Sequence, residues 1–181
     1  MRLTPTEIPG VMVVDAAVQS DERGGFGRTY DEATFAAAGL PTRWPQCNTS
    51  WNTRRGTLRG LHYQAPPRPD PKIVRCTAGG VFDVVVDLRP DSPAFRRWIG
   101  IELSAARRNA IYIPVGCAHG FLTLEDASEV FYMMAEVYAP ELARGARWND
   151  PAFAISWPFP PAVLNERDAT WPDFLRSTTP T

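Results

Sequence analysis

Two histidines and a single lysine are the side chains of this sequence best suited to moving protons near neutral pH. His62 lies in residues 59–64 and His119 in residues 114–121, each with glycines close by. An imidazole changes its charge between about pH 5 and 8, so it can act as a general base or acid. Lys72 is the only lysine, and its ammonium can approach a single oxygen end-on, unlike the planar guanidinium of arginine. These residue types are compatible with acid–base chemistry, although a histidine taken singly is more often structural.

The same histidines raise the question of a metal site. Such a site needs three or four His, Cys, Asp or Glu ligands that converge. The sequence has no His-x-His pair, because Gln64 stands two positions after His62 and His119 is far away. A histidine-rich site is therefore excluded, and a site of two histidines with carboxylates stays open. We expect no metal.

The composition indicates one ordinary domain over residues 1–181, with 44% hydrophobic residues and a formal charge of -1. This charge gives no electrostatic argument for a nucleic-acid or membrane-surface partner. No apolar run approaches the roughly 20 residues of a membrane helix, and the N-terminus does not resemble an export signal. The cysteines, Cys47, Cys76 and Cys117, form no Cys-x-x-Cys pair. We therefore expect a cytoplasmic protein with three small, buried, reduced cysteines.

Strand patterns dominate the chain. They cover residues 72–77, 81–88, 98–103, 110–113, 120–124 and 129–134, with turn residues between them. Short strands at such spacing predict a sandwich or barrel. A helix is expected from Asp31 to Ala38, with Asp31 as its cap and Gly39 at its end. From Pro151 the prolines exclude a central strand, so we expect an ordered arm that packs on the barrel and delivers residues 164–168.

Several ordered motifs are similar to those of one enzyme family. They are residues 57–64, 72–75, 80–89, 114–121, 147–151, 155–158 and 164–168. In this order, from about Asp21 to Asp168, they resemble the dTDP-4-dehydrorhamnose 3,5-epimerase family. The resemblance implies an all-β fold, a cupin-type double-stranded β-helix (jelly-roll barrel) with a few short helices. It also implies a homodimer with exchanged N-terminal strands, a dTDP-4-keto-6-deoxyhexose substrate and no cofactor.

Epimerisation next to a ketone needs a base on one face of the sugar, an acid on the other, and a group that stabilises the enolate oxygen. The resemblance assigns the base to His62, oriented by Asp168, and the acid to Tyr132. It places Lys72 near the C4 oxygen. His119 matches a second histidine of the site, which positions ligand or water rather than acting as the base.

The resemblance also implies a nucleotide subsite. Arg59 is expected to bind the diphosphate with its planar fork of donors. The other residues expected to bind the substrate are Gln46, Asn48, Ser50 and Tyr138, together with Arg23 and Phe26 from the neighbouring subunit.

Three residues depart from the family pattern: Arg28 and Ala143 stand where acidic residues are usual, and Met133 replaces a lysine. The first two are expected near the nucleotide, so they put nucleotide contacts in doubt. Within the family, the sequence does not decide whether C3, C5 or both are inverted. A metal-dependent cupin oxygenase or isomerase and a non-catalytic sugar-nucleotide binder remain as alternatives.

Overall fold

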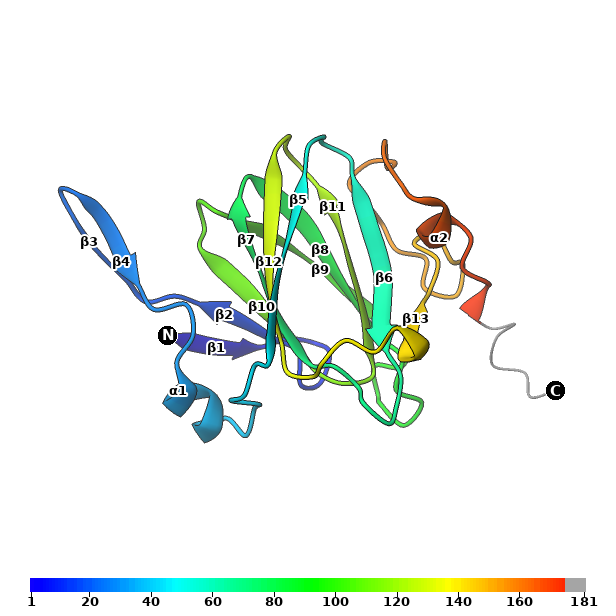
Figure 1. The fold of residues 1–181 in the computed structure, drawn as a ribbon, viewed down its shortest axis with the longest axis horizontal. Helices are drawn as coiled ribbons and strands as arrows, with labels where there is room; N and C mark the ends of the chain where they lie inside the picture. The colour runs from blue at the N-terminus through cyan, green and yellow to red at the C-terminus, as the bar shows by residue number, and fades with distance from the viewer. Residues whose placement is uncertain (175–181) are drawn as a thin grey trace.

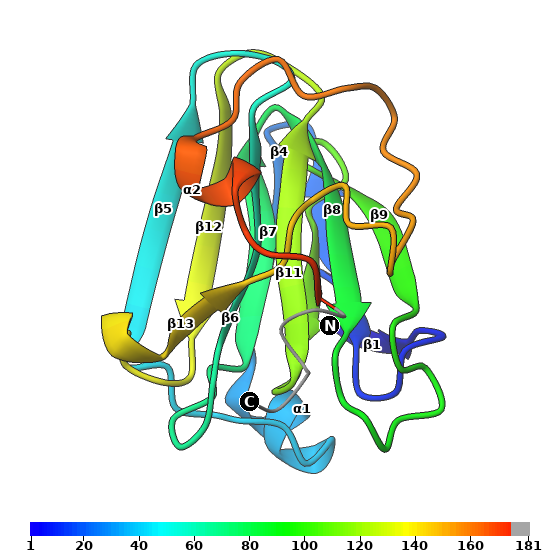
Figure 2. The same ribbon diagram turned by 90° about the vertical axis from the view of Figure 1, so that its right-hand side faces the viewer.

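Two antiparallel sheets face each other and form a barrel (Figures 1 and 2). The computed structural model describes residues 1–174. Within that range the six-stranded sheet runs β1, β2, β10, β7, β12, β5, with bounds Arg2–Pro5, Met12–Asp15, Asn109–Ile113, Lys72–Ala78, Ser128–Met134 and Gln46–Asn52. The five-stranded sheet of the same range runs β13, β6, β11, β8, β9, with bounds Ala143–Gly145, Leu58–Gln64, Cys117–Thr123, Gly80–Asp87 and Trp98–Ser104. A separate hairpin, β3 (Val18–Asp21) and β4 (Gly24–Gly27), projects from the barrel (Figure 1).

The main hydrophobic core lies between the two sheets, because alternate residues of each strand point inward. Val74, Ile111 and Val130 come from the six-stranded sheet, and Val85 and Phe121 come from the five-stranded sheet. All five are buried. Burying an apolar side chain of this kind contributes about 1.5–3 kcal/mol. Packing between the facing sheets therefore fixes the strands that also carry polar residues. The predicted sandwich or barrel is confirmed.

A short helix, α1 (Glu32–Ala37), and the residues around it cover the outer face of the six-stranded sheet. The side chain of Asp31 caps this helix by accepting a hydrogen bond from the backbone N–H of Thr34 at 2.9 Å. Phe35 is fully buried against the sheet. Gly39 has a φ of +69°, the left-handed conformation that commonly follows a helix. The predicted helix, its cap and its glycine end are confirmed.

The C-terminal segment covers the outer face of the five-stranded sheet (Figure 2). It includes a 3-10 turn, Pro140–Leu142, and the one-turn helix α2 (Glu166–Ala169). Phe153 and Trp157 pack against the apolar side chains of that face, namely Leu61, Val84, Val86 and Ala118. The expectation of an ordered arm on the barrel is confirmed.

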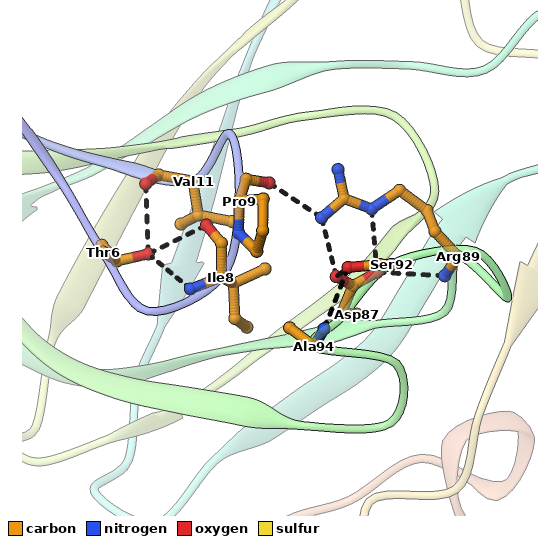
Figure 3. Close-up of polar contacts among 8 residues, drawn as sticks. All are labelled: Thr6, Ile8, Pro9, Val11, Asp87, Arg89, Ser92 and Ala94. Carbon is orange, nitrogen blue, oxygen red and sulfur yellow. Dashed lines mark hydrogen bonds and ion pairs between the residues drawn. The ribbon is translucent and has the colours of Figure 1, made fainter.

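A buried carboxylate ties the loop between β1 and β2 to the end of β8 (Figure 3). Asp87 accepts hydrogen bonds from Nε and Nη2 of Arg89 at 2.8 and 2.7 Å, and from the hydroxyl of Ser92. Nη2 of Arg89 also donates to the carbonyl of Pro9 at 2.8 Å. The hydroxyl of Thr6 makes further hydrogen bonds within the loop. This cluster fastens the N-terminal strands to the opposite sheet.

The structure confirms most of the element predictions and corrects one cysteine. All six predicted strand segments coincide with strands, namely β7, β8, β9, β10, β11 and β12. Cys76 and Cys117 are buried as predicted, but Cys47 is exposed. The prediction was wrong there because Cys47 precedes Asn48, whose side chain faces the space between the sheets, so the side chain of Cys47 points to the outer face of β5. Among residues 1–174, no helix is long and apolar enough to cross a membrane.

Candidate active site

A cavity of about 320 Å³ opens between the two sheets. It is lined by strands of both sheets and by the segment around α2. Nine of the twelve residues predicted for the site line it: Asn48, Ser50, Arg59, His62, Lys72, His119, Tyr132, Tyr138 and Asp168. The fold therefore collects into one place residues that are scattered over most of the chain.

The wall formed by the six-stranded sheet presents polar groups through the pleat of three neighbouring strands. Tyr132 on β12 pairs with Asn48 on β5, and Met134 pairs with Gln46 on β5 and with Lys72 on β7. Directly paired residues, and residues two apart on one strand, point to the same face of a sheet. This register directs Asn48, Lys72 and Tyr132 toward the cavity.

The wall formed by the five-stranded sheet places the two histidines side by side. His62 on β6 and His119 on β11 are directly paired, and the register shifts just beyond them. Gly60 and Gly120 meet at this shift, where a Cβ on Gly60 would overlap the backbone of Gly120. The absence of both side chains lets the strands approach closely. The glycines near each histidine thus have a structural reason.

His62 is paired with a buried carboxylate. Its Nε2 lies 2.6 Å from Oδ1 of Asp168, and Oδ2 of Asp168 accepts the backbone N–H of Gly60 at 3.1 Å. Burial acts to raise the pKa of Asp168, but the hydrogen bonds from His62 and Gly60 outweigh it, so this pKa is lowered. The ionised carboxylate favours the imidazole tautomer with its proton on Nε2. The lone pair of Nδ1 is then available to act as a base.

A second histidine–aspartate pair is fully buried. Nε2 of His119 lies 2.8 Å from Oδ2 of Asp83, whose pKa is raised by burial and lowered in part by the neighbouring His119. The ring of Tyr132 packs edge-on to the ring of His119, with 6.2 Å between their centroids. Burial, followed by the charge of Asp83, raises the pKa of Tyr132 far above its ordinary value. This phenol is therefore protonated at neutral pH and can donate a proton.

The single lysine is held in the cavity wall by one carboxylate. Nζ of Lys72 lies 3.1 Å from Oδ2 of Asp70, and their side chains are only 8% and 11% exposed. Asp70 also accepts the backbone N–H of Gln64 at 3.2 Å. Because a buried charge is costly unless it is paired, Asp70 allows an ammonium group to be placed here.

Two further predicted residues act at the rim of the cavity. Arg59 is exposed, and its Nε donates to Oδ1 of Asn52 at 2.8 Å, which orients the guanidinium. Gln46 does not line the cavity. Its Oε1 instead accepts the backbone N–H of Tyr138 at 2.7 Å, so it holds the loop that carries that ring.

Arg23 and Phe26 lie on the projecting hairpin and do not line the cavity of their own chain. Phe26 is 79% exposed, and Arg23 forms an ion pair with Asp21 of the same hairpin. The hairpin projects on the opposite side of the barrel from β6, β13 and α2 (Figure 1). Within one chain, Arg23 and Phe26 therefore lie apart from the other ten predicted site residues.

Sequence reasoning missed several residues of the site, namely Asp70, Asp83, Arg144, Asn165 and Arg167. Asp83 had the clearest signal, because a carboxylate in the middle of an apolar strand requires a buried partner. Asp70 stands two residues before Lys72, at a distance that allows an ion pair. Asn165 and Arg167 belong, with Asp168, to the motif at residues 164–168. Once that motif is placed at the site, both residues are expected there as well.

The three departures from the family pattern have different structural settings. Met133 points away from the cavity and packs against the cluster that contains Phe35. Arg28 forms an ion pair with Asp31, the cap of α1, at 2.7 Å. Ala143 lines the cavity itself. Of the three substitutions, the one at Ala143 therefore changes the surface that a ligand in this chain would meet.

Within residues 1–174, no group of three or more His, Cys, Asp or Glu side chains is placed to hold a metal ion. Each histidine contacts an aspartate instead. The absence of a metal in the working protein stays a prediction.

The chain matches the family model for dTDP-4-dehydrorhamnose 3,5-epimerase over residues 5–176. It belongs to this family. It is 40% identical over 176 residues to dTDP-4-dehydrorhamnose 3,5-epimerase of Shigella flexneri, which covers 97% of each chain. It is also 39% identical over 169 residues to dTDP-4-dehydrorhamnose 3-epimerase of Streptomyces niveus, with 93% of this chain and 81% of that one covered.

Solved structures of the epimerase family have the same fold. The crystal structure of dTDP-4-dehydrorhamnose 3,5-epimerase from Elizabethkingia anophelis NUHP1 matches with a TM-score of 0.93 and 35% identity, covering 99% of each chain. The predicted cupin-type barrel is therefore confirmed. The chain is a sugar-nucleotide epimerase, and so an isomerase.

Proposed function

We propose that this epimerase inverts carbons next to the C4 ketone of a dTDP-4-keto-6-deoxyhexose, with His62 as base and Tyr132 as acid. One observation carries the proposal: the two residues line one cavity from opposite sheets, on β6 and β12. Inversion requires a proton to leave one face of the sugar and another to arrive at the opposite face. Groups on facing walls can do both without moving the sugar between steps.

The proposed steps balance without an added reagent. Nδ1 of His62 takes the proton from the carbon, and the electron pair of that C–H bond forms an enolate at the C4 oxygen. Asp168 stabilises the imidazolium that results. The hydroxyl of Tyr132 then gives its proton to the same carbon from the other side as the C4 carbonyl re-forms. Exchange with solvent returns both side chains to their starting states.

Lys72 is assigned to the C4 oxygen. An ammonium presents one compact donor end-on, which suits an oxygen that gains negative charge during the reaction. His119 is assigned to positioning the ligand or a water molecule, because its Nε2 contacts Asp83 and its side chain is only 6% exposed. With these assignments, Lys72 on β7 and His119 on β11 approach the sugar from different strands.

The nucleotide is assigned to the rim of the cavity. Arg59 would bind the diphosphate, since a guanidinium matches phosphate oxygens with two parallel donors. Asn48, Ser50 and Tyr138 line the cavity as further contacts, and Gln46 supports Tyr138. Ala143 leaves open space where the family pattern has a carboxylate, so we expect looser selection among nucleotides there.

The decisive experiment follows dTDP-4-keto-6-deoxyglucose by NMR in D2O. The wild-type protein should exchange deuterium at the inverted carbons, and His62→Asn should lower this exchange by about 10²–10⁴-fold because the base is lost. His119→Asn is the matched comparison and should raise KM more than it lowers exchange. Exchange retained in His62→Asn and lost in His119→Asn would reverse the assignment. No exchange by the wild-type protein would identify a non-catalytic binder.

The same assay, followed carbon by carbon, decides between double and single epimerisation. The relative from Streptomyces niveus is named a 3-epimerase, whereas the Shigella flexneri relative is named a 3,5-epimerase. Elemental analysis of the active protein, with activity measured after chelation, separates this proposal from that of a metal-dependent cupin.

We also propose that the protein works as a homodimer in which the hairpin of one subunit reaches the site of the other. In the described residues β5 pairs on one side only. Trp51 on this strand is 71% exposed, and Phe26 on the projecting hairpin is 79% exposed. Large apolar side chains at an open strand edge favour pairing with another chain.

Subunit mixing tests this arrangement. His62→Asn and Arg23→Ala should each be impaired, but a mixed dimer holds one site with a native His62 and a native Arg23 from the partner. Activity should therefore be partly restored on mixing. If dimers shown to have exchanged subunits regained no activity, Arg23 would serve the site of its own subunit, and the proposed exchange of hairpins would be wrong.

The cytoplasmic location and the single domain over residues 1–181 stay predictions. The three free cysteines support a reducing environment. The part of the domain prediction beyond residue 174 lies outside the described residues.

A further inference from the structure

The turn that carries Asp168 cannot hold its own position. The helix α2 has four residues, and a helix of one turn is unstable without tertiary contacts. Its cap, Asn165, accepts the backbone N–H of Asp168 at 2.7 Å, which fixes the local shape of the turn but not its place on the barrel. That place must come from contacts with the sheet, and Trp171, three residues beyond Asp168, makes one of them.

Trp171 lies on the face of the sheet from which the side chain of His62 projects. Gly145 on β13 pairs with His62 on β6, and side chains of paired residues lie on one face. The three atoms nearest to the place of a Cβ on Gly145 all belong to the indole of Trp171, and they are closer than non-bonded atoms can approach. The indole therefore fills the missing side-chain space of Gly145, immediately beside His62.

The same indole also contacts the helix that carries Asp168. The guanidinium carbon of Arg167 on α2 lies 5.1 Å from the ring centroid of Trp171. Nε1 of the indole is buried and has no acceptor within hydrogen-bonding distance among residues 1–174. Burial acts to raise the pKa of Asp168, and the indole N–H is among the groups that lower it. The indole N–H therefore lies near the carboxylate of Asp168.

We propose that Trp171 is a positioning residue that holds Asp168 against Nε2 of His62 by seating its indole over Gly145. The inference rests on the proposed function, because it concerns the His62–Asp168 pair. It assigns a role to a residue outside the acid, the base and the nucleotide contacts. Removing the ring would leave a void over β13 into which the turn can move, and small displacements of a catalytic pair lower rates strongly.

Variants of Trp171 and Gly145 distinguish the effect of the indole ring from that of its N–H group. Trp171→Ala should lower deuterium exchange about 10–100-fold with little change in KM. Trp171→Phe keeps a flat ring over Gly145 and should stay within about threefold of the wild-type rate. Gly145→Ala adds a methyl group in the space of the indole and should cause a loss similar to that of Trp171→Ala. The double variant should be no worse than either single variant, because both remove the same contact.

The state of His62 gives a readout that a merely structural role would not move. The chain has two histidines, so a ¹⁵N-histidine spectrum holds two imidazole spin systems, assigned with His62→Asn. In the wild-type protein His62 should show the tautomer protonated at Nε2. In Trp171→Ala and Gly145→Ala its nitrogen shifts should move toward a mixture of tautomers, and in Trp171→Phe they should stay near the wild-type values.

Trp157→Ala is the matched control. Trp157 belongs to the same C-terminal segment, donates its indole N–H to the carbonyl of Trp148 at 2.9 Å and packs against Phe82, away from Asp168. This variant should lose stability without a change in the His62 nitrogen shifts. The same shift change in Trp157→Ala would overturn the proposal, because any loosening of the arm would then have the effect.

A folded Trp171→Ala protein with wild-type exchange and unchanged His62 shifts would also overturn the proposal. If Trp171→Ala does not fold, Gly145→Ala carries the same test, and a wild-type rate in that variant would overturn the proposal equally. The spectra are recorded without substrate. They therefore test whether Trp171 positions Asp168 against His62, even if His62→Asn retains deuterium exchange and His62 proves not to be the base.

Discussion

Asp168 places Oδ1 2.6 Å from Nε2 of His62 and Oδ2 3.1 Å from the backbone nitrogen of Gly60, 106 and 108 residues away along the chain. Each carboxylate oxygen thus faces one N–H group. A carboxylate satisfies both donors at once, whereas an amide has one accepting end and one donating end. The pair is therefore sensitive to a change that leaves size and shape almost unaltered.

Asp168→Asn should leave the fold intact and lower turnover by about 10²–10⁴-fold. The amide must turn its NH₂ group toward either His62 or Gly60, so it favours the wrong imidazole tautomer or breaks the anchor of the turn. Exchange and inversion in D2O should fall together. Asp173→Asn is the control, since it removes a carboxylate of the same segment that pairs with Arg147. Normal turnover in Asp168→Asn would remove this carboxylate from the mechanism.

Lys72→Arg should be nearly as damaging as Lys72→Ala, although it keeps the positive charge. The side chain of Lys72 is 8% exposed beside Asp70, so the wall has little room for a planar guanidinium. The fork would also present its donors at a different angle to an oxygen in the cavity. We expect a loss of about 10²–10³-fold in kcat, as for removal of a donor to a developing oxyanion.

Rates for Lys72→Arg, Lys72→Ala and Lys72→Met, measured side by side, test this point. Lys72→Met keeps the length of the chain without the charge. If Lys72→Arg retained most of the activity while Lys72→Met lost it, the requirement would be for charge alone, and the end-on contact would be wrong.

Strand periodicity predicted β7 to β12, but it missed β5 and β6, which have seven residues each. Polar residues and a glycine interrupt the apolar alternation of these two strands. The short strands at the N-terminus and β13 have three or four residues each, too few for a periodic signal, and β4 resembles a glycine-rich turn. The helix α2 was missed for the same reason, although Asn165 caps it visibly. Local pattern therefore identified most of the barrel, but it missed the strand that carries His62 and the short elements at the rim.

The site was predictable where a residue type is rare. Two histidines and one lysine drew attention to His62, His119 and Lys72, and the family resemblance supplied the rest. The carboxylate partners, Asp70 and Asp83, were missed because aspartates are common in any sequence. The contact of Asp83 with His119 also depends on the register between β8 and β11. Register arises from the whole sheet, so a single stretch of sequence does not contain it.

Asp87→Asn tests the cluster that ties the N-terminal loop to β8 (Figure 3). Burial acts to raise the pKa of Asp87, but hydrogen bonds from Arg89 and Ser92 outweigh it, so folding lowers this pKa. A carboxyl group of this kind stabilises the folded state above its unfolded pKa of about 3.9, and the effect is lost as the pH falls through the folded value. Asp87→Asn should therefore lower the free energy of unfolding by about 2–3 kcal/mol at neutral pH.

Urea unfolding of both proteins across a pH series measures this difference. The gap between wild type and Asp87→Asn should be constant near neutral pH and should shrink below about pH 4. Asp91→Asn, at an exposed position in the same loop, is the control and should change little. A gap that stays the same down to acid pH would mean that the charge of Asp87 contributes nothing.

Tyr132→Phe separates proton exchange from inversion. His62 could still remove the proton and return a deuteron from solvent to the same face, whereas the acid on the other face would be missing. The variant should therefore incorporate deuterium at C3 or C5 while forming little inverted product, as measured by NMR in D2O. The raised pKa of Tyr132, caused by burial and the charge of Asp83, keeps the phenol protonated as this role requires. Tyr138→Phe is the control and should leave the ratio of inversion to exchange unchanged. Equal loss of exchange and inversion in Tyr132→Phe would point to a structural role for Tyr132. Full inversion would assign the protonation to another group. The family assignment would stand in either case.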